Sequence, residues 1–518
     1  MDSGPPTPTE QPILPKVAII GSGVSGLAAL WALTHDPSKR THEVHLFEAA
    51  DYLGGHTHTV TYKHGSEIIA VDTGFIVMNA ATYPNFISFL KHLRIPTIPT
   101  QMTFSVTRDQ GAFEWSGSSL SSLFAQRSNL FRPSMWRMLF DIIRFNTFAL
   151  DLLTTSSEGD SEEETLGAYL DREGYSDAFR NDYLIPMTAA VWSTSPDTCA
   201  LEFPAVTLVR FMWNHNLLNI VSSRPQWLTV KGGAKNYVEA VARAVPAHQV
   251  HMCMPVTSVR GSGSIGEDGC EKVLVSAKRG SVEFEYEYDH VIVATHGDQA
   301  LRLLGEGATE TEREILGEFR TSRNTAVLHG DKKLLPVRKS AWAAWNYLTS
   351  STPTSANVAQ VSLTYNMNIL QYIPPQRFGD VLVTLNPLSP PDPATVQGVY
   401  EYEHPLYTPE AVAAQRRLPE IQGKRGITFA GAWTGYGFHE DGFTSGLRAA
   451  VGGLGAEVPF EVRDARCVKG VRPPGRGLVE RALRTLVGVV YLVIVVLEAL
   501  LGKGAVRREP VGRRKKEL

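Results

Sequence analysis

The chain has 518 residues, enough for two or more hydrophobic cores, and 43% of them are apolar, as in folded globular proteins. Its formal net charge is −3, so no overall basic field points to a nucleic-acid partner. The four cysteines lie far apart without a CxxC pair, which argues against a disulfide framework or a zinc site and suits a reducing compartment: Cys199, Cys253, Cys270 and Cys467. Residues 1–15 are rich in Pro and Thr without an apolar core, so we expect a disordered leader rather than a signal peptide.

The first predicted element is a strand that runs into a glycine-rich turn. An apolar run, Val17–Ile20, is followed directly by Gly-Ser-Gly-Val-Ser-Gly at residues 21–26. A helical pattern and a second strand, His42–Phe47, come next, and Glu48 ends that strand 22 residues beyond the last glycine. This order predicts a dinucleotide-binding unit in which the acid accepts hydrogen bonds from ribose hydroxyls. The alternative is a glycine-rich turn in some other α/β protein.

Each glycine of this turn has its own physical role. Gly21 allows the tight turn, Gly23 lets a pyrophosphate approach the backbone, and Gly26 lets the helix pack closely on the strand. The helix begins at Val24 and Ser25, where free N–H groups and a partial positive charge favour phosphate binding.

A glycine doublet carries a resemblance to a known family. Gly54 and Gly55 stand in Tyr-Leu-Gly-Gly-His-Thr-His, shortly after the ribose acid. The chain resembles the flavin-containing amine oxidase superfamily over about residues 16–451, and most of all the flavoproteins related to the N-terminal domain of plant cyclopropane fatty acid synthases. The resemblance implies FAD, with the doublet at its pyrophosphate. His56 stands where most of the superfamily has arginine.

The resemblance implies further cofactor contacts along the chain. After a hairpin pattern over Thr57–Val71, the turn Thr73-Gly74 would bring the backbone beside the flavin ring; without the family it is an ordinary strand-end turn. A strand over Val250–Val256 resembles the segment whose backbone meets the adenine, at Val256. Residues 272–288 predict a β-meander that Asp289–Thr295 completes.

The middle of the chain predicts an inserted substrate domain. A very apolar helix over Met135–Leu153 is expected to line an apolar cavity, to touch a membrane or to be a buried helix of that domain. The acidic run Ser156–Glu164 is expected to be a solvated loop. Between Leu301 and Glu420, aromatic residues and strand-like runs predict an antiparallel sheet with one face toward a pocket.

The fold expected from these patterns is a two-domain α/β flavoprotein. A Rossmann-type FAD-binding domain is assembled from separated segments, and an α+β substrate domain is inserted between them. The FAD-binding segments are 16–80, 227–300 and 421–455, and the substrate-domain segments are 81–226 and 301–420.

The last FAD-binding segment supplies the expected flavin contacts. Here a buried strand ends at Gly431, and a helix follows that begins at Gly442 or later. In the superfamily the matching helix points its N-terminus at the flavin, where backbone N–H groups stabilise negative charge on the reduced ring. The resemblance therefore implies backbone contacts from Gly442 and Phe443. Ala432 stands where the superfamily usually has an acid bound to the ribityl chain, and the segment has no cysteine, so non-covalent FAD is expected.

A dense cluster of ionisable groups precedes this helix. His439 or Glu440 is the candidate for a proton-transfer group or a substrate anchor. Alternatively, Glu440 and Asp441 cap the helix N-terminus, and this is the preferred role for Asp441. Trp433 and Tyr436 are the candidates for the aromatic pair that amine oxidation requires beside the ring.

The C-terminus predicts membrane attachment. After a linker at 456–477, an apolar helix is expected over 478–502, and Thr485–Leu497 within it is a run of 13 residues without charge. A spanning helix needs about 20 apolar residues, so the helix is expected to span the membrane, to lie on it, or to pack on the protein's own surface. The tail at 503–518 has seven Lys or Arg against two Glu, which favours an anionic lipid surface. Its last four residues resemble a dilysine retrieval signal of the endoplasmic reticulum.

Together with these patterns, the resemblance implies an FAD-dependent oxidoreductase that moves a hydride from a carbon centre to the flavin. The apolar tail and the relationship to the cyclopropane-synthase flavodomains favour a lipid or fatty acyl substrate, with the catalytic domain on the cytosolic side of the membrane. The alternatives are an amine oxidase proper, a flavin-dependent lipid isomerase or desaturase, and a non-enzymatic flavoprotein partner of a lipid methyltransferase.

Overall fold

A parallel sheet forms the centre of the computed structural model, which describes residues 14–155, 164–192, 201, 203–218, 225–266, 269–352, 355–465 and 477–500. The order of this five-stranded sheet is β10-β2-β1-β14-β20, and every pairing is parallel. Its strands are β1 (Lys16–Ile20), β2 (Glu43–Phe47), β10 (Val250–His251), β14 (His290–Val293) and β20 (Ile427–Phe429). With α1 (Val24–Thr34) between β1 and β2, the predicted strand–turn–helix–strand unit is confirmed.

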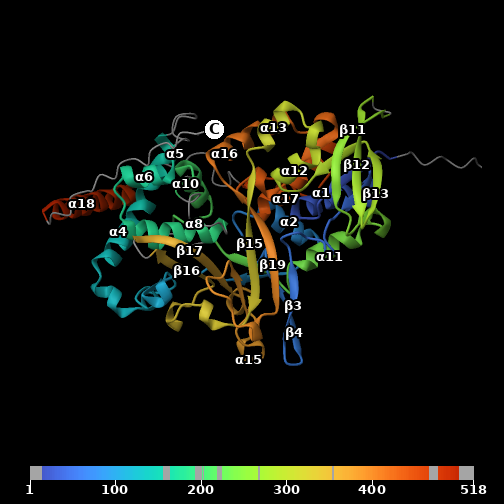
Figure 1. Cartoon of the computed structure of the whole chain (residues 1–518). Helices are drawn as coiled ribbons and strands as arrows, with labels where there is room; N and C mark the ends of the chain where they lie inside the picture. Colours follow the sequence, from blue (N-terminus) through green and yellow to red (C-terminus); the bar gives the residue numbers. More distant parts are fainter. Residues whose placement is uncertain are drawn as a thin grey trace, which may run out of the picture.

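Two layers cover the faces of this sheet (Figure 1). Because side chains alternate along a strand, Ile19 of β1 faces one layer and Ile20 faces the other. The first layer contains α1, α2 (Pro84–His92), α11 (Lys235–Arg243) and α17 (His439–Leu454). The second contains the antiparallel meander β11 (Val256–Ile265), β12 (Glu271–Arg279) and β13 (Val282–Tyr288), with α12 (Gly297–Leu304), α13 (Glu310–Leu316) and α16 (Pro409–Arg417).

The structure corrects two of the predicted strands. The strand expected over Val250–Val256 is divided into β10 and β11, because the chain turns at Cys253, which has a φ of 52°. The run Asp289–Thr295 does not complete the meander. Instead, β14 within it pairs in parallel with β1 and β20, and the meander takes β11 as its third strand.

The second domain is built on a seven-stranded sheet in the order β19-β15-β18-β17-β16-β7-β8. Its strands are β7 (Phe104–Arg108), β8 (Phe113–Ser116), β15 (Arg320–His329), β16 (Trp345–Thr352), β17 (Ser355–Asn366), β18 (Leu382–Leu385) and β19 (Gly398–Leu406). All neighbours are antiparallel except β16 and β7, so the prediction of an antiparallel sheet is confirmed for the later part of the chain. Two small sheets join the domains: the hairpin β3 (Thr59–His64) with β4 (Glu67–Asp72), and the sheet of β5 (Met78–Asn79), β9 (Trp227–Val230) and β6 (Thr97–Thr100).

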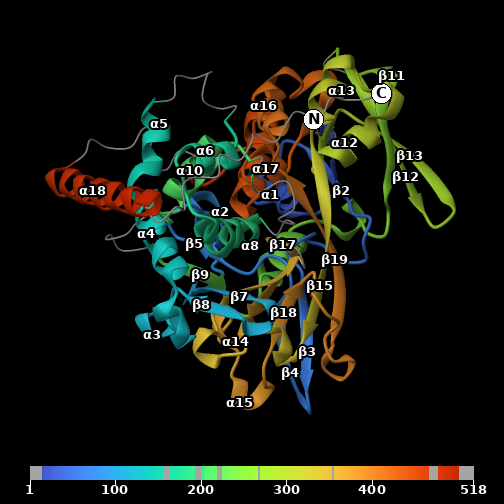
Figure 2. The same cartoon turned by 60° about the vertical axis from the view of Figure 1, so that its left-hand side comes forward.

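A group of helices covers one side of this second sheet (Figure 2). The helix predicted over Met135–Leu153 is α4 (Pro133–Phe148), followed by a 3₁₀ turn, η4 (Ala149–Asp151), and by α5 (Leu152–Thr155). Only one face of α4 is buried, since Met138 and Phe145 lie in the core whereas Trp136 is exposed. The remaining helices are α3 (Leu120–Leu123), α6 (Leu166–Arg172), α7 (Asp177–Phe179), α8 (Ile185–Trp192), α10 (Ala205–Asn214), α14 (Met367–Leu370), α15 (Pro375–Phe378) and, at the C-terminus, α18 (Leu478–Leu500). The leader at 1–13 and most of the acidic run at 156–164 lie outside the described residues.

The two ends of the FAD-binding domain are joined by a close contact between α1 and α17. A Cβ atom on Gly442 would lie 2.6 Å from Val24 Cγ1, and one on Gly446 would overlap the carbonyl oxygen of Ser25. Glycine at 446 therefore lets the two helix backbones touch, and glycine at 442 makes room for the side chains of Val24 and Ser25. The expectation that a helix begins at Gly442 or later is corrected, because α17 starts three residues earlier, at His439.

This contact predicts that Gly446→Ala destabilises the protein. The added methyl group must displace the α1 backbone, and overpacking of this kind costs about 1–3 kcal/mol. Gly452→Ala on the same helix is the matched control, since its Cβ meets no atom within 4 Å and alanine stabilises helices by about 0.5–1 kcal/mol relative to glycine. Urea denaturation of both variants measures the difference, and equal effects would contradict the close contact.

Candidate active site

A cavity of about 1100 Å³ lies between the two domains, at the carboxyl ends of the parallel strands. Four separated parts of the chain line it: the glycine turn with Glu48, the doublet region, the segment that follows β14, and the segment between β20 and α17. The second domain closes the cavity with residues of β19, β16, β17 and α10. The predicted site residues on the lining are Gly21, Gly23, Val24, Ser25, Glu48, Gly54, Gly55, His56, Gly74, Val256, Gly431, Trp433 and His439.

The glycine turn has the geometry of a phosphate cradle. Gly21 has a φ of +98°, and a Cβ there would lie 2.8 Å from Ala294 O, so only glycine fits. A Cβ on Gly26 would overlap Gly21 O. Gly23 differs from both, because its Cβ position meets no atom within 4 Å. The turn therefore holds its own shape through Gly21 and Gly26 and presents Gly23 to open space.

The groups that a dinucleotide needs surround this open space. Among the described residues, none accepts a hydrogen bond from the backbone N–H of Val24 or Ser25, at the start of α1. The doublet lies against the turn, since a Cβ on Gly55 would be 3.2 Å from the Cα of Gly23. The Glu48 carboxylate is held at the turn by Ser22, whose N–H donates to Glu48 Oε2 at 2.9 Å. The residues present therefore fit a pyrophosphate and a ribose.

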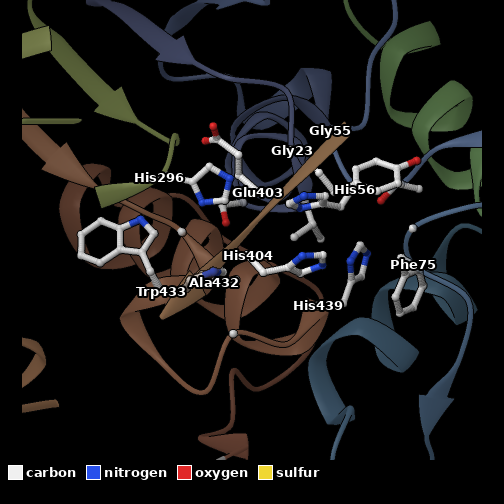
Figure 3. A pocket seen from close by; sticks show the side chains of 18 of the residues that line it. Gly23, Gly55, His56, Phe75, His296, Glu403, His404, Ala432, Trp433 and His439 are labelled. Carbon is white, nitrogen blue, oxygen red and sulfur yellow. The ribbon is translucent and has the colours of Figure 1, made fainter. Parts of the chain in front are cut away.

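Five histidines line the cavity, and four of them come from four different segments that meet in it: His56, His296, His404 and His439 (Figure 3). The fifth, His215, follows α10. The rings of His56 and His404 are stacked with their centroids 5.2 Å apart and 10° between their planes. Burial lowers the pKa of all four side chains, to about 4 for His404 and about 3 for His439. At neutral pH these four imidazoles are therefore uncharged.

The orientation of two of these rings is set by hydrogen bonds. Asn386 donates to Asn324 Oδ1 at 2.7 Å, so Asn324 turns its N–H groups toward His404 Nδ1, 2.8 Å away. His404 Nδ1 is consequently an acceptor, and its proton is on Nε2. His439 stacks on Phe75 with the ring centroids 3.7 Å apart, and its Nε2 lies 2.9 Å from the Tyr237 hydroxyl.

The structure corrects the candidate role of Glu440. Its side chain lies outside the cavity lining, is 1% exposed, and accepts hydrogen bonds from the backbone N–H groups of Asn85 and Phe86 at 2.9 Å each. These N–H groups belong to the first turn of α2, so Glu440 caps a helix other than its own. Burial raises the pKa of this carboxyl to about 8. Asp441 accepts from the backbone N–H of Phe438 at 3.0 Å and thus caps α17, the role that the sequence favours for it.

The predicted aromatic pair does not face the cavity as a pair. The Trp433 indole N–H donates to Thr295 O at 2.9 Å, and its ring packs on Phe319, so the side chain is directed into the core (Figure 3). Tyr436 is not on the cavity lining and packs near Phe211. Ring stacks that do line the cavity include Phe75 with His439 and His56 with His404.

Other predicted contacts also lie behind the lining. The Thr73 hydroxyl is 2.6 Å from the Tyr402 hydroxyl and donates to His58 O at 3.1 Å, so it braces the wall from behind. Gly26, Gly442 and Phe443 are placed in the packing of α1 and α17. The N-terminus of α17 reaches the cavity through Phe438 and His439 instead.

Sequence reasoning missed several of the lining side chains. His296 follows β14 by three residues, and the rule that ligands bind at the carboxyl ends of parallel strands could have found it. His404 and Tyr402 lie on one face of β19, where the alternating run Tyr-Glu-Tyr-Glu-His at residues 400–404 carried a signal. No pattern within the sequence brings His56 and His404 together.

The cradle predicts that Gly23→Ala weakens FAD binding without unfolding the protein. The methyl group meets no protein atom, but it occupies the space that the pyrophosphate needs. We expect the affinity for FAD to fall by about tenfold or more, which corresponds to about 1.4 kcal/mol, and the melting temperature of the flavin-free protein to stay unchanged. Titration with FAD measures the affinity, and thermal denaturation of the flavin-free protein measures the melting temperature. Gly452→Ala is the control, and an unchanged FAD affinity in Gly23→Ala would contradict the cradle.

The buried Glu440 carboxyl predicts a pH-dependent stability. Between the ordinary pKa of a glutamic acid and about 8, the folded protein keeps a proton that the unfolded chain releases, so the free energy of unfolding falls as pH rises through this window. Glu440→Gln cannot ionise. From about pH 5 to about pH 9 we expect the stability of the variant relative to the native protein to rise, by on the order of a few kcal/mol. Urea denaturation at several pH values measures the difference, and a constant difference would contradict this assignment.

Comparison with known proteins agrees with this geometry. The sequence matches the model of the family described as flavin containing amine oxidoreductase over residues 24–452. No protein with a curated description matches it significantly.

Solved structures share the fold at low sequence identity. A putrescine oxidase bound to putrescine superposes with a TM-score of 0.58 at 16% identity, covering 85% of this chain and 99% of that one. Cyclohexylamine oxidase from Brevibacterium oxydans IH-35A has a TM-score of 0.55 at 15% identity, covering 85% and 98%. A CLA-producing fatty acid isomerase from P. acnes has a TM-score of 0.55 at 14% identity, covering 85% and 99%. With the family match over most of its length and a cavity that fits a dinucleotide, the chain belongs to the flavin-containing amine oxidoreductase family, as an oxidoreductase with a flavin cofactor.

Proposed function

We propose that the protein oxidises a carbon centre of a lipid or fatty acyl chain, with FAD held non-covalently. When bound, FAD would supply the redox chemistry, as the acceptor of a hydride that oxygen or another oxidant would then remove as electrons. The observation that carries the proposal is the chemistry of the cavity wall on the side of the second domain.

The cavity wall on this side is mostly apolar. The side chains that form it come from α10, β9, β16, β17 and the loops beside them: Ile76, Val77, Met102, Phe211, Leu217, Trp227, Trp345 and Tyr365. Burial of a hydrocarbon chain against such a wall gains about 25 cal/mol per Å² of apolar surface. A fatty acyl chain matches this wall better than a small charged molecule does.

Every charged side chain on the described lining already has a protein partner. Arg302 pairs with Asp298 at 2.7 Å, and Arg323 lies 3.4 Å from Glu403. The two remaining carboxylates accept from hydroxyls, Glu401 from Thr325 at 2.7 Å and Glu48 from Ser22 at 2.5 Å. A substrate ammonium group would have to compete with these partners, whereas a hydrocarbon chain needs none of them.

Residues of three segments would hold the cofactor. The N–H groups at the start of α1 and the doublet would bind the pyrophosphate, and Glu48 would bind the ribose. Val256 lines the cavity next to Phe47, at the end where the adenine would lie. The two cysteines that the structure describes, Cys253 and Cys270, are exposed and do not line the cavity, which supports non-covalent binding.

His439 is better suited to anchor the substrate than to carry a proton. Burial lowers its pKa to about 3, so the imidazole stays neutral at physiological pH. Stacking on Phe75 and the contact with the Tyr237 hydroxyl hold the ring in one orientation at the cavity wall. The neutral ring then orients the substrate and helps to exclude water.

A membrane is the source of such a substrate, and we propose that α18 attaches the protein to it. Among the described helices, α18 is the one that is long and apolar enough to cross a membrane. The basic tail at 503–518 favours an anionic, cytosolic membrane surface.

An anaerobic absorbance experiment tests the proposed reaction. Acid precipitation of the purified protein should release FAD into the supernatant, because no covalent link holds it. Addition of unsaturated or methyl-branched fatty acyl lipids should bleach the oxidised flavin spectrum, and addition of putrescine or cyclohexylamine should not.

Each other outcome selects a different reaction. Bleaching by amines alone would show an amine oxidase, like the putrescine and cyclohexylamine oxidases that share the fold. Conversion of a fatty acid without net consumption of an acceptor would show an isomerase, the activity in the name of the P. acnes neighbour. Bound flavin that no lipid or amine bleaches would favour a non-enzymatic partner.

A further inference from the structure

The C-terminal helix α18 lies at the edge of the molecule, next to α4 (Figures 1 and 2). One stripe of the helix is turned inward, with Val487 5% exposed and with Leu483, Tyr491 and Ile494 half-buried. These positions recur every three or four residues, so they form a single face of the helix. The helix is thus docked on the second domain along its length.

Three side-chain contacts at equal intervals hold α18 on α4 and the turn after it. Arg137 Nη1 donates to Glu498 Oε1 at 3.0 Å. Seven residues further along the first segment, the Arg144 guanidinium lies over the Tyr491 ring at 3.7 Å. After another seven residues, Asp151 forms an ion pair with Arg484.

The register of these contacts shows that the two helices run antiparallel. Positions 137, 144 and 151 meet positions 498, 491 and 484, so each step of seven residues forward on one helix is a step of seven back on the other. Seven residues are about two helical turns, so each set lies on one helix face. We call these contacts the three-rung ladder.

Further hydrogen bonds tie the same face to the protein. Arg484 donates to Thr147 O at 2.7 Å, and the Tyr491 hydroxyl donates to Glu173 O at 3.1 Å. Arg144, which lies under the Tyr491 ring, is 5% exposed. Three polar residues of α18, Arg484, Tyr491 and Glu498, therefore have partners within the protein, whereas Arg481 and Thr485 are exposed.

The opposite face of α18 is made of aliphatic residues. They are 38–85% exposed: Leu478, Val479, Leu486, Val489, Val490, Leu492, Val493, Val495, Val496, Leu497 and Leu500. Trp136 of α4, next to Arg137 in the ladder, is 52% exposed. Such a long, contiguous apolar surface requires a partner.

We propose that α18 lies in the plane of the membrane, docked on α4, with its aliphatic face in the lipid of one leaflet. This inference rests on the membrane attachment proposed above and not on the proposed reaction. The partner is an anionic lipid surface. Arg481 is exposed at one end of the helix, and seven Lys or Arg follow its other end in the tail at 503–518. Positive charge at both ends attracts anionic head groups and repels a second copy of the chain.

A spanning orientation is disfavoured by the ladder. Arg484 and Glu498 are 14 residues apart, which is about 21 Å along a helix, whereas the hydrocarbon core is about 30 Å thick. A helix that left α4 to cross the membrane would place at least one of these charges in hydrocarbon. It would also leave Asp151, Arg137 and Arg144 without these partners.

The in-plane arrangement places the lipid surface close to the cavity. The helix α10, whose Phe211 lines the cavity, contacts η4 and α5, the continuation of α4 that carries Asp151. Between the lipid and α10 there would then lie α18 itself and the segment of α4, η4 and α5.

Cysteine labelling of the full chain in sealed microsomes tests the orientation. The four native cysteines are replaced by serine, and a single cysteine is introduced either at Gly477 or after Leu518. Retained FAD content confirms that these proteins are folded. For an in-plane helix, a membrane-impermeant maleimide should label both positions equally without detergent. If the terminal cysteine is protected until detergent is added, the helix spans the membrane and the proposal is overturned.

Flotation with vesicles of phosphatidylcholine and phosphatidylserine tests the lipid partner. The double variant Leu492→Glu/Val496→Glu should lose at least about tenfold in the bound fraction at unchanged FAD content. The matched control is Val282→Glu/Val399→Glu, which alters exposed valines elsewhere and should float like the native chain. If the native chain does not float but forms a dimer, and Leu492→Glu/Val496→Glu dissociates that dimer, the partner of α18 is a second copy of the chain and the proposal is overturned. Neither readout depends on turnover, so failure of the proposed reaction leaves this test intact.

Discussion

The contact between α1 and α17 is the constraint on which the site depends. Gly446 lets the backbone of α17 touch that of Ser25, and Gly442 leaves room for the side chain of Val24, so neither position of α17 can carry a Cβ atom without a clash. The contact holds the C-terminal segment against the glycine turn, more than 400 residues earlier in the sequence. As a result the N-terminus of α1, which would bind phosphate, and the first turn of α17 with His439 open into one cavity.

Burial then decides the charge state of this cavity. The four histidines lose their positive charge because desolvation disfavours the imidazolium. Glu440 sits behind the wall with its carboxyl at the N-terminus of α2, where backbone N–H groups satisfy its oxygens. A low-charge, mostly apolar cavity beside a dinucleotide cradle suits oxidation of a hydrocarbon chain, since no ionic group of the substrate is needed for its binding.

The same separation of polar and apolar groups recurs at the surface. On α18 the side chains of Arg484, Tyr491 and Glu498 contact the protein and most aliphatic residues face outward, which is the reverse of a surface helix in water. The three-rung ladder supplies specific partners for the polar face, so the outward face is free to contact lipid. The cavity and the aliphatic face are connected through α10, α5, η4 and α4, and both are suited to long hydrocarbon chains.

The cofactor-binding residues with a local signature can be recognised from the sequence alone. A backbone position with positive φ, or one without room for a Cβ atom, requires glycine, so the turn at residues 21–26 and the doublet are visible as glycines. Glu48 is recognised by its spacing from this turn. Only the tertiary structure decided which side chains meet across distant segments. Glu440 caps α2 instead of lining the cavity, Trp433 turns into the core, and His404 stacks on His56, because each contact depends on how helices and sheets pack. The apolar character of α18 could likewise be predicted from the sequence, but its contact with α4 could not. The seven-residue spacing of Arg484, Tyr491 and Glu498 does not indicate which helix carries their partners.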